Sequence, residues 1–227
     1  MEVHREATET VATRRISVVD SVYERIYERL MSLAIPPGAR IPIDVLAREL
    51  GVSQTPVREA LSRLEREHLV QKAHLIGYSA APQFNRKQFE DLFDFRLLVE
   101  PEGARLAALN MTAESLQYLE AIAADMADGG TPVDRTSRYS RFARIDAHFH
   151  DEIMRIAGNE VIRTTLYNQH VHLHLFRLLF HTRVTQEALE EHENLMAAFR
   201  ARDPGAAEAA MREHISRSRE RLMSAFE

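Results

Sequence analysis

The sequence predicts a mainly α-helical protein in two parts, an N-terminal winged helix-turn-helix and a C-terminal all-α antiparallel helical bundle. Three helical segments and then two short extended runs, at 70–72 and 77–79, predict the first part. Six further helical segments with no alternating segment of strand length between them predict the second. We therefore expect a flexible tail at residues 1–18, a winged domain at 19–82, a linker at 83–87 and a helical domain at 88–227.

Composition excludes several classes of protein. The chain has 227 residues, 45% of them hydrophobic, a formal net charge of −5 and no cysteine. Disulfides, a cysteine nucleophile and a thiolate zinc site are therefore excluded. No apolar run approaches the roughly 20 residues that span a bilayer, and the first 15 residues lack the apolar core of a signal peptide. We expect a soluble, cytoplasmic protein with no membrane partner.

Bulk charge gives no sign of nucleic-acid binding. The first 82 residues carry 11 basic and 11 acidic side chains, whereas a protein that binds nucleic acid through bulk electrostatics has a clear basic excess. A DNA-binding function must therefore be argued from local pattern.

The N-terminal helices are bounded by residues that start or stop helices. The first should be capped by Asp20 or Ser21 and end before the Pro-Pro-Gly sequence at 36–38. The second should cover residues 43–50. Ser53 is positioned to cap the third, which runs to about residue 67.

The third helix buries one face and presents polar groups on the other. Arginine can donate two hydrogen bonds to guanine and glutamine can bind adenine, while hydroxyls at a helix start suit a phosphate. Polarity alone also fits an ordinary surface helix, which is the commoner case. The candidate DNA contacts are Ser53, Gln54, Thr55, Arg58 and Ser62.

The stretch GVSQTPVREALSRLE at 51–65, preceded by IPPGARIPIDVLAREL, resembles the DNA-binding domain of GntR-family bacterial transcription regulators. The resemblance covers about residues 19–82. It implies that Thr55 and Arg58 are the principal contacts, with Ser53 and Gln54 beside them. It also places His74 at a wing position that enters the minor groove.

The C-terminal part should contain helices at about 88–109, 112–127, 137–157, 160–181, 185–202 and 204–224, with Gly129 to Pro132 in one of the breaks. Pro101 lies inside the first of these helices and should kink or split it.

Four inward polar residues predict a metal site. Asp146 and His150 share the apolar face of one helix because they are four residues apart. His192 and His214 lie equally far before and after Asp203 at the bend of a helical hairpin, so they should face one another about 16 Å from it. One carboxylate and three imidazoles suit a divalent cation, zinc first, with nickel or manganese as alternatives. The commoner alternative for any one of these histidines is a hydrogen-bonded core residue. His148 projects to the polar face and is rejected as a ligand.

An effector site is expected near polar residues on otherwise apolar helix faces. Helix 160–181 carries a polar stripe that includes His181, and Arg96 projects inward, where its guanidinium could clamp a carboxylate. The alternatives are an ion pair between Arg96 and Glu100 and, for the stripe, a subunit interface or core hydrogen bonds. The candidate effector contacts are Arg96, His170, His174 and Arg177.

The segments RLLVEP at 96–101, ARLAA at 104–108 and DAHFHDEIMRIAGN at 146–159, followed by two histidines a helical hairpin apart, resemble the FCD effector domain of the FadR subfamily. The resemblance covers about residues 85–225. It implies a metal held by Asp146, His150, His192 and His214 and an effector that is a small carboxylate, such as a hydroxy acid, sugar acid or citrate-like molecule. Six helices instead of seven indicate the shorter, VanR-like version.

Together these patterns predict a homodimeric, ligand-responsive transcription regulator, a repressor released by its effector, on pseudo-palindromic double-stranded operator DNA. One alternative is a metal-dependent hydrolase fused to a DNA-binding domain, in which Glu100 is the only candidate for a general base. Another is a structural metal with regulation through partner proteins.

Overall fold

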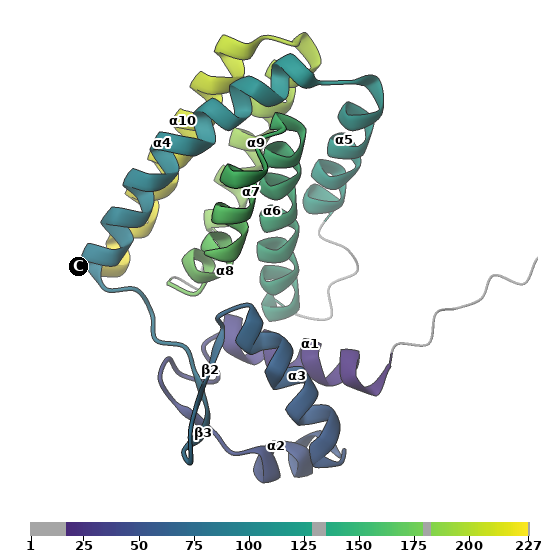
Figure 1. The fold of residues 1–227 in the computed structure, drawn as a ribbon, viewed down its shortest axis with the longest axis vertical. Helices are drawn as coiled ribbons and strands as arrows, with labels where there is room; N and C mark the ends of the chain where they lie inside the picture. Colours follow the sequence, from purple (N-terminus) through teal and green to yellow (C-terminus); the bar gives the residue numbers. More distant parts are fainter. Residues whose placement is uncertain (1–16, 129–134, 179–182, 227) are drawn as a thin grey trace, which may run out of the picture.

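The computed structural model describes residues 17–128, 135–178 and 183–226. Within them the protein is mainly helical, and a small N-terminal part with a short sheet lies against one end of a larger helical bundle (Figure 1). This confirms the predicted fold class. Most of the expected tail, the Gly129–Pro132 break and His181 lie outside the described residues. No described helix is long and apolar enough to cross a membrane.

The first helix, α1, spans Val18–Met31 and begins earlier than predicted. Its cap is Ser17, whose hydroxyl accepts the backbone N–H of Asp20 at 3.0 Å, so the expected caps Asp20 and Ser21 are wrong. Asp20 instead lies in the first turn, where its carboxylate faces the positive end of the helix dipole and binds Arg63 at 2.7 Å.

Helices α2 (Ile43–Leu50) and α3 (Gln54–Arg66) follow the predicted bounds closely. Gly51 ends α2 with φ +68°, a left-handed conformation that glycine adopts without a steric penalty. Among the described residues, strands β1 (Arg40–Ile41), β2 (Val70–Ala73) and β3 (Gly77–Ala80) form one antiparallel sheet in the order β1-β3-β2. The hairpin of β2 and β3 is the expected wing, whereas the two-residue β1 was not predicted.

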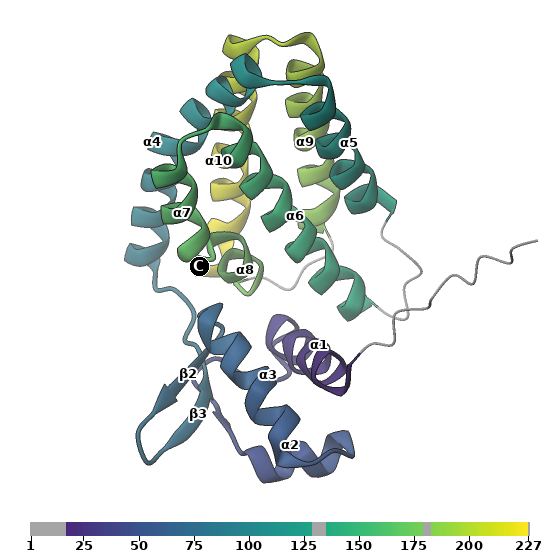
Figure 2. The same cartoon turned by 45° about the vertical axis from the view of Figure 1, so that its right-hand side comes forward.

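The C-terminal part consists of α4 (Arg86–Asn110), α5 (Ala113–Asp128), α6 (Arg135–Ala157), α7 (Glu160–Asn168), α8 (Val171–Phe176), α9 (Arg183–Ala201) and α10 (Pro204–Met223), then a 3-10 turn at Ser224–Phe226. Helices α4 and α10 run side by side along one flank (Figure 1), and α6 lies at the centre against α4, α5, α7 and α8 (Figure 2). Helix α6 also contacts α1, so one helix connects the bundle core with the N-terminal part.

Two predictions about these helices are corrected. Pro101 was expected to kink or split its helix, and the split is wrong, because α4 continues through Pro101 as one helix that packs against α10. The single helix expected at 160–181 is instead α7 and α8, separated at Gln169 and His170. His170 has φ +44°, which ends the regular α-helix. A segment that is apolar nearly all round gives no periodic signal of such a break. With seven α-helices among the described residues 86–226, helix count lends no support to the shorter version of the domain.

Candidate metal and effector site

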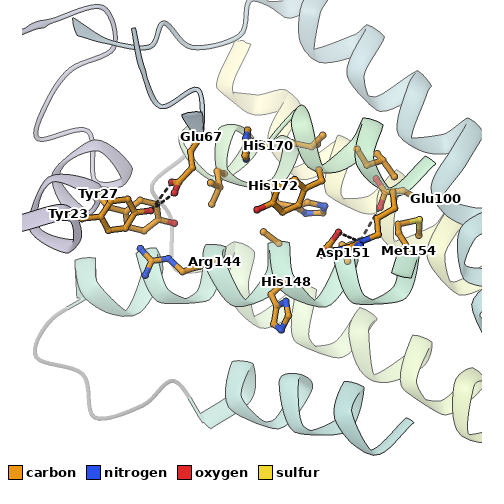
Figure 3. Close-up of a pocket in the computed structure, with 17 residues that line it drawn as sticks. Tyr23, Tyr27, Glu67, Glu100, Arg144, His148, Asp151, Met154, His170 and His172 are labelled. Carbon is orange, nitrogen blue, oxygen red and sulfur yellow. Dashed lines mark hydrogen bonds and ion pairs between the residues drawn. The ribbon is translucent and has the colours of Figure 1, made fainter. Parts of the chain in front are cut away.

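A cavity of about 260 Å³ lies between α6 and the segment that forms α7 and α8. Glu100, His150 and His172 form its buried end, and Tyr23 and Glu67 of the N-terminal part form the opposite end (Figure 3). Small-molecule sites commonly enclose about 300–1,000 Å³. The cavity is therefore close to the size of a small-ligand site, and its wall includes both parts of the chain.

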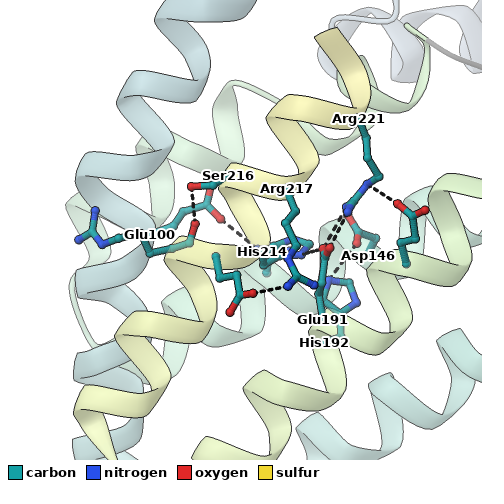
Figure 4. A network of polar contacts seen from close by, with 12 residues as sticks. Glu100, Asp146, Glu191, His192, His214, Ser216, Arg217 and Arg221 are labelled. Carbon is teal, nitrogen blue, oxygen red and sulfur yellow. Dashed lines mark hydrogen bonds and ion pairs between the residues drawn. The ribbon is translucent and has the colours of Figure 1, made fainter. Parts of the chain in front are cut away.

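The four predicted metal ligands form one buried cluster, and one of them, His150, lines this cavity. Asp146 and His150 lie on α6, His192 on α9 and His214 on α10, and each is at most 5% exposed. The three imidazoles offer nitrogens within 4.8 Å of one another, and Asp146 Oδ1 lies 3.4 Å from His192 Nε2 (Figure 4). The spacing argument thus predicted a real cluster of side chains.

The cluster has buried polar atoms without a hydrogen-bond partner among the described residues. They are Nε2 of His150 and both ring nitrogens of His192. A buried polar atom left unpaired costs about 1–3 kcal/mol. A divalent cation held by these nitrogens would remove that cost, so the donor set fits the metal that was predicted from the sequence.

Two carboxylates orient the imidazoles. Glu100 Oε2 lies 3.0 Å from His150 Nδ1, and Glu191 Oε2 lies 2.8 Å from His214 Nδ1. Arg221 in turn donates two hydrogen bonds to Glu191. A carboxylate on Nδ1 fixes the ring so that Nε2 offers its lone pair, as in many metal sites. Glu191 was not among the residues predicted from the sequence. The available signal was its position directly before His192 on the same helix.

The protonation states also fit a metal. Burial lowers the pKa of His150, His192 and His214, which favours their neutral forms. Burial alone would raise the pKa of Asp146, but the hydrogen bond from His172 and the nearby imidazoles outweigh it and hold that pKa below its ordinary value. Neutral imidazoles beside an ionised carboxylate are the forms that ligate a cation.

His172, on α8, is a site residue that sequence reasoning missed. Its Nδ1 lies 2.9 Å from Asp146 Oδ2, and its ring centroid lies 4.2 Å from that of His150. On the single helix expected at 160–181, His172 falls away from the stripe of His170 and His174. The break at His170 changes its direction, so only the alternation of histidines at 170, 172 and 174 could have indicated it.

Arg96 is placed differently from the expected effector clamp. It is 1% exposed and makes two hydrogen bonds with Glu100, from Nε at 2.5 Å and Nη2 at 3.2 Å. It lines a separate cavity of about 20 Å³, which has room for about one water molecule. The geometry favours the ion-pair alternative. Because Glu100 accepts from both Arg96 and His150, it is not free to act as a general base.

The other candidate effector contacts divide between two surfaces. His170 lines the large cavity, whereas His174 and Arg177 do not. The His174 ring packs 5.1 Å from that of Phe84, and Arg177 Nη2 donates to the carbonyl of Ala81 at 2.8 Å. The expected stripe is therefore not one face, because the chain turns at His170.

Helix α8 and its flanking residues connect the metal-ligand cluster with the N-terminal part. His170 Nε2 lies 3.1 Å from the carbonyl oxygen of Arg66 at the end of α3. Gln83, in the joint between the two parts, donates to the carbonyl of Arg177. A movement of α8 would therefore change the contacts at the end of α3 and at the joint.

Helix α6 makes a second connection. Arg144 donates from Nη1 to Glu24 of α1 at 2.7 Å, and its guanidinium lies 4.2 Å from the ring centroid of Tyr27. The Tyr27 hydroxyl donates to the carbonyl of Ser140 at 3.2 Å. Arg144 is two residues from Asp146, so the same helix carries a site residue and an attachment to α1.

The candidate DNA-contact residues are all exposed. Val57, Ala60, Leu61 and Leu64 form the buried face of α3. Ser53 is the N-cap residue, but its hydroxyl makes no capping hydrogen bond, and Arg58 Nη2 lies 3.3 Å from Gln54 Oε1. The exposed residues are Ser53, Gln54, Thr55, Arg58 and Ser62, together with His74 in the wing turn.

The fold and these surfaces define a DNA-binding transcription regulator with a C-terminal helical domain. Residues 18–78 match the bacterial regulatory proteins of the gntR family, and residues 91–217 match the FCD domain. The chain belongs to the GntR family of bacterial regulators and carries an FCD effector domain.

Known proteins resemble the chain over most of its length. A transcriptional regulator from an unstable DNA locus of Streptomyces ambofaciens is 29% identical, with 86% of this chain and 80% of the relative covered. A protein of Paenarthrobacter nicotinovorans named "Probable D-xylose utilization operon transcriptional repressor" is 27% identical, with 89% and 87% covered. The structure of Escherichia coli McbR/YncC has a TM-score of 0.66 and 21% identity, covering 93% of this chain and all of that one, which shows a shared fold.

Proposed function

We propose that the protein is a homodimeric repressor that binds operator DNA through α3 and releases it when a small carboxylate, such as a hydroxy acid or sugar acid, binds in the helical domain. The observation that carries the proposal is the buried cluster of one aspartate and three histidines, of which His150 lines a cavity that both parts of the chain form. The Paenarthrobacter relative is named as a repressor, which supports repression as the mode of regulation.

The DNA-binding role rests on the chemistry of the exposed side of α3. Arg58 can donate two hydrogen bonds to guanine O6 and N7, and Gln54 can bind adenine. Ser53 and Thr55 lie where the free N–H groups of the helix start also attract a phosphate. Ser62 lies about one turn beyond Arg58 on this face, and His74 provides the wing contact. A dimer would place two copies of α3 on a pseudo-palindromic site.

The ligands of the metal would be Asp146, His150, His192 and His214. Three nitrogens and one oxygen without a thiolate suit zinc, with nickel or manganese as alternatives. A bound divalent cation would supply a Lewis acid to which a carboxylate oxygen of the effector can coordinate. Glu100 and Glu191 hold His150 and His214 in the orientation that this requires.

The route from effector to DNA runs through α8 and α6. His172 of α8 binds Asp146, while His170, the residue before α8, binds the end of α3. Arg144 binds α1 from the helix that carries Asp146. A ligand that displaces His172 would shift α8 and so alter the position of α3. Coupling of only about 1–3 kcal/mol changes operator affinity 5–150-fold.

A binding experiment tests the proposal. Fluorescence anisotropy would measure affinity for an operator fragment selected from genomic DNA, first with zinc-loaded protein and then with small carboxylates added. We expect specific binding that weakens in the presence of a carboxylate, and no such weakening for the metal-free protein. Carboxylates that bind without changing operator affinity would contradict the regulatory role, and an absence of specific DNA binding would contradict the function altogether.

A further inference from the structure

The cavity of the effector site crosses the boundary between the two parts of the chain. Its lining on α6 extends from Arg144 to Met154, a distance of about 15 Å at 1.5 Å per residue. His150 of the metal-ligand cluster lies at one end beside Glu100, and Tyr23, Tyr27 and Glu67 are at the other. A ligand only a few atoms long that reaches the cluster would leave the distant end unfilled.

The wall between the two ends is mainly apolar. Its apolar residues are Ala147, Met154, Leu166, Val171 and Leu173, and the cavity is also lined by Arg144, His148, Asp151, Arg163, Tyr167 and His170. Removing apolar surface from water favours a ligand with an apolar body. A sugar acid, with a hydroxyl on every carbon, would place part of its hydroxyls against apolar side chains that offer no hydrogen bond.

The distant end offers an acceptor with spare capacity. Glu67, at the C-cap of α3, is half-buried, and its two carboxylate oxygens share the single hydroxyl of Tyr23, at 2.8 and 2.7 Å. An ionised carboxylate can accept about four hydrogen bonds. Within residues 17–128, 135–178 and 183–226, Tyr23 is the one side chain with a hydrogen bond to Glu67. A donor on a ligand therefore has an unoccupied position there.

We propose that the effector is a carboxylate with an apolar body and a hydroxyl or amino group at its far end, and that this far group donates a hydrogen bond to Glu67. The inference rests on the proposed function and narrows its ligand class to acids whose second polar group is remote from the carboxylate. Such a ligand touches the metal-ligand cluster and the end of α3 at once. The DNA-binding part then forms one wall of the effector site itself.

Three probes test this on the zinc-loaded full-length protein by isothermal titration calorimetry, namely acetate, octanoate and ω-hydroxyoctanoate. We expect octanoate to bind more tightly than acetate, because it buries apolar surface, and ω-hydroxyoctanoate to bind more tightly still. Glu67→Gln should weaken ω-hydroxyoctanoate about tenfold, since it removes a charge-assisted hydrogen bond, and should leave octanoate unchanged. Glu114→Gln is the matched control, because Glu114 is exposed and does not line the cavity.

The possible outcomes distinguish a failure of this inference from a failure of the proposed function. If acetate and octanoate bind equally, or if Glu67→Gln weakens both long acids alike, the inference is overturned while a carboxylate sensor survives. Failure of all three acids to bind the zinc-loaded protein would also overturn the inference, whereas the proposed function is tested separately by the effect of hydroxy acids and sugar acids on operator affinity. The wild-type comparison of the three acids decides the matter even if Glu67→Gln does not fold.

Discussion

His172 Nδ1 of α8 lies 2.9 Å from Asp146 Oδ2 of α6, and this hydrogen bond joins the metal-ligand cluster to the segment that contacts the DNA-binding part. Two residues earlier, His170 Nε2 lies 3.1 Å from the carbonyl oxygen of Arg66 at the end of α3. One short helix thus connects the cluster with α3.

Replacing His172 should weaken metal binding. Loss of a hydrogen bond that orients a metal-ligating carboxylate typically costs 10–100-fold in metal affinity. We therefore expect His172→Ala to bind zinc 10–100-fold more weakly than wild type, measured by competition with a chromophoric chelator. His148→Ala is the control, because that histidine of the same helix is exposed and makes its hydrogen bond with Tyr118 instead of Asp146. Equal zinc affinities for wild type and His172→Ala would show that His172 has no part in positioning Asp146.

Zinc should stabilise the wild type and not a ligand variant. A ligand that binds only the folded state stabilises it by about 4 kcal/mol at a thousandfold excess over its dissociation constant. We expect zinc to raise the melting temperature of the wild-type protein and to leave that of His192→Ala nearly unchanged, in scanning calorimetry after treatment with chelator. The reason is that both ring nitrogens of His192 are buried and without partners among the described residues. A similar rise in both proteins would place the metal elsewhere.

Stability of the metal-free protein should fall as the solution becomes acidic. Burial, with a smaller effect of Arg177, lowers the pKa of His174 to about 3. Below about pH 6.5 the unfolded chain gains a proton that folded His174 does not, so the free energy of unfolding decreases from there toward pH 3. This histidine alone should account for about 1.4 kcal/mol between pH 7.5 and pH 5.5.

Urea unfolding at those two pH values measures the effect. His174→Gln should lose about 1.4 kcal/mol less than wild type over the interval, because its side chain does not titrate. His148→Gln serves as the matched exchange at an exposed position. A pH dependence in His174→Gln as steep as that of the wild type would contradict the assignment.

Arg58 should be required for specific DNA binding. A bidentate contact between arginine and guanine is worth about 1–3 kcal/mol, so Arg58→Ala should lose about 10–100-fold in operator affinity with fold and metal content unchanged. Electrophoretic mobility shift assays, circular dichroism and metal analysis check the three parts. Arg86→Ala, at an exposed position of α4 outside the winged domain, should bind as wild type does. Undiminished operator affinity in Arg58→Ala would rule out α3 as the recognition helix.

Much of the fold and of the metal-ligand cluster could be predicted because it depends on spacing along the chain. The bounds of α2 follow from its apolar pattern and from Gly51, which readily adopts the left-handed conformation that ends a helix. Asp146 and His150 share a face because they are four residues apart on one helix. His192 and His214 meet because they are equally far from a bend at Asp203 and Pro204. These relations hold in any regular helix or tight hairpin.

The tertiary structure decided where a helix breaks, which buried charges pair and which distant helices come into contact. The break at His170, in a segment apolar nearly all round, directed His172 to Asp146 and moved His174 and Arg177 away from the cavity. The pairing of Arg96 with Glu100 was one of two open alternatives, and burial without room for a ligand selected it. The contact of α1 with α6 joins residues more than a hundred positions apart, as in Glu24 with Arg144. Sequence periodicity reports which side of a helix is apolar, but it carries no information about which distant surface covers that side.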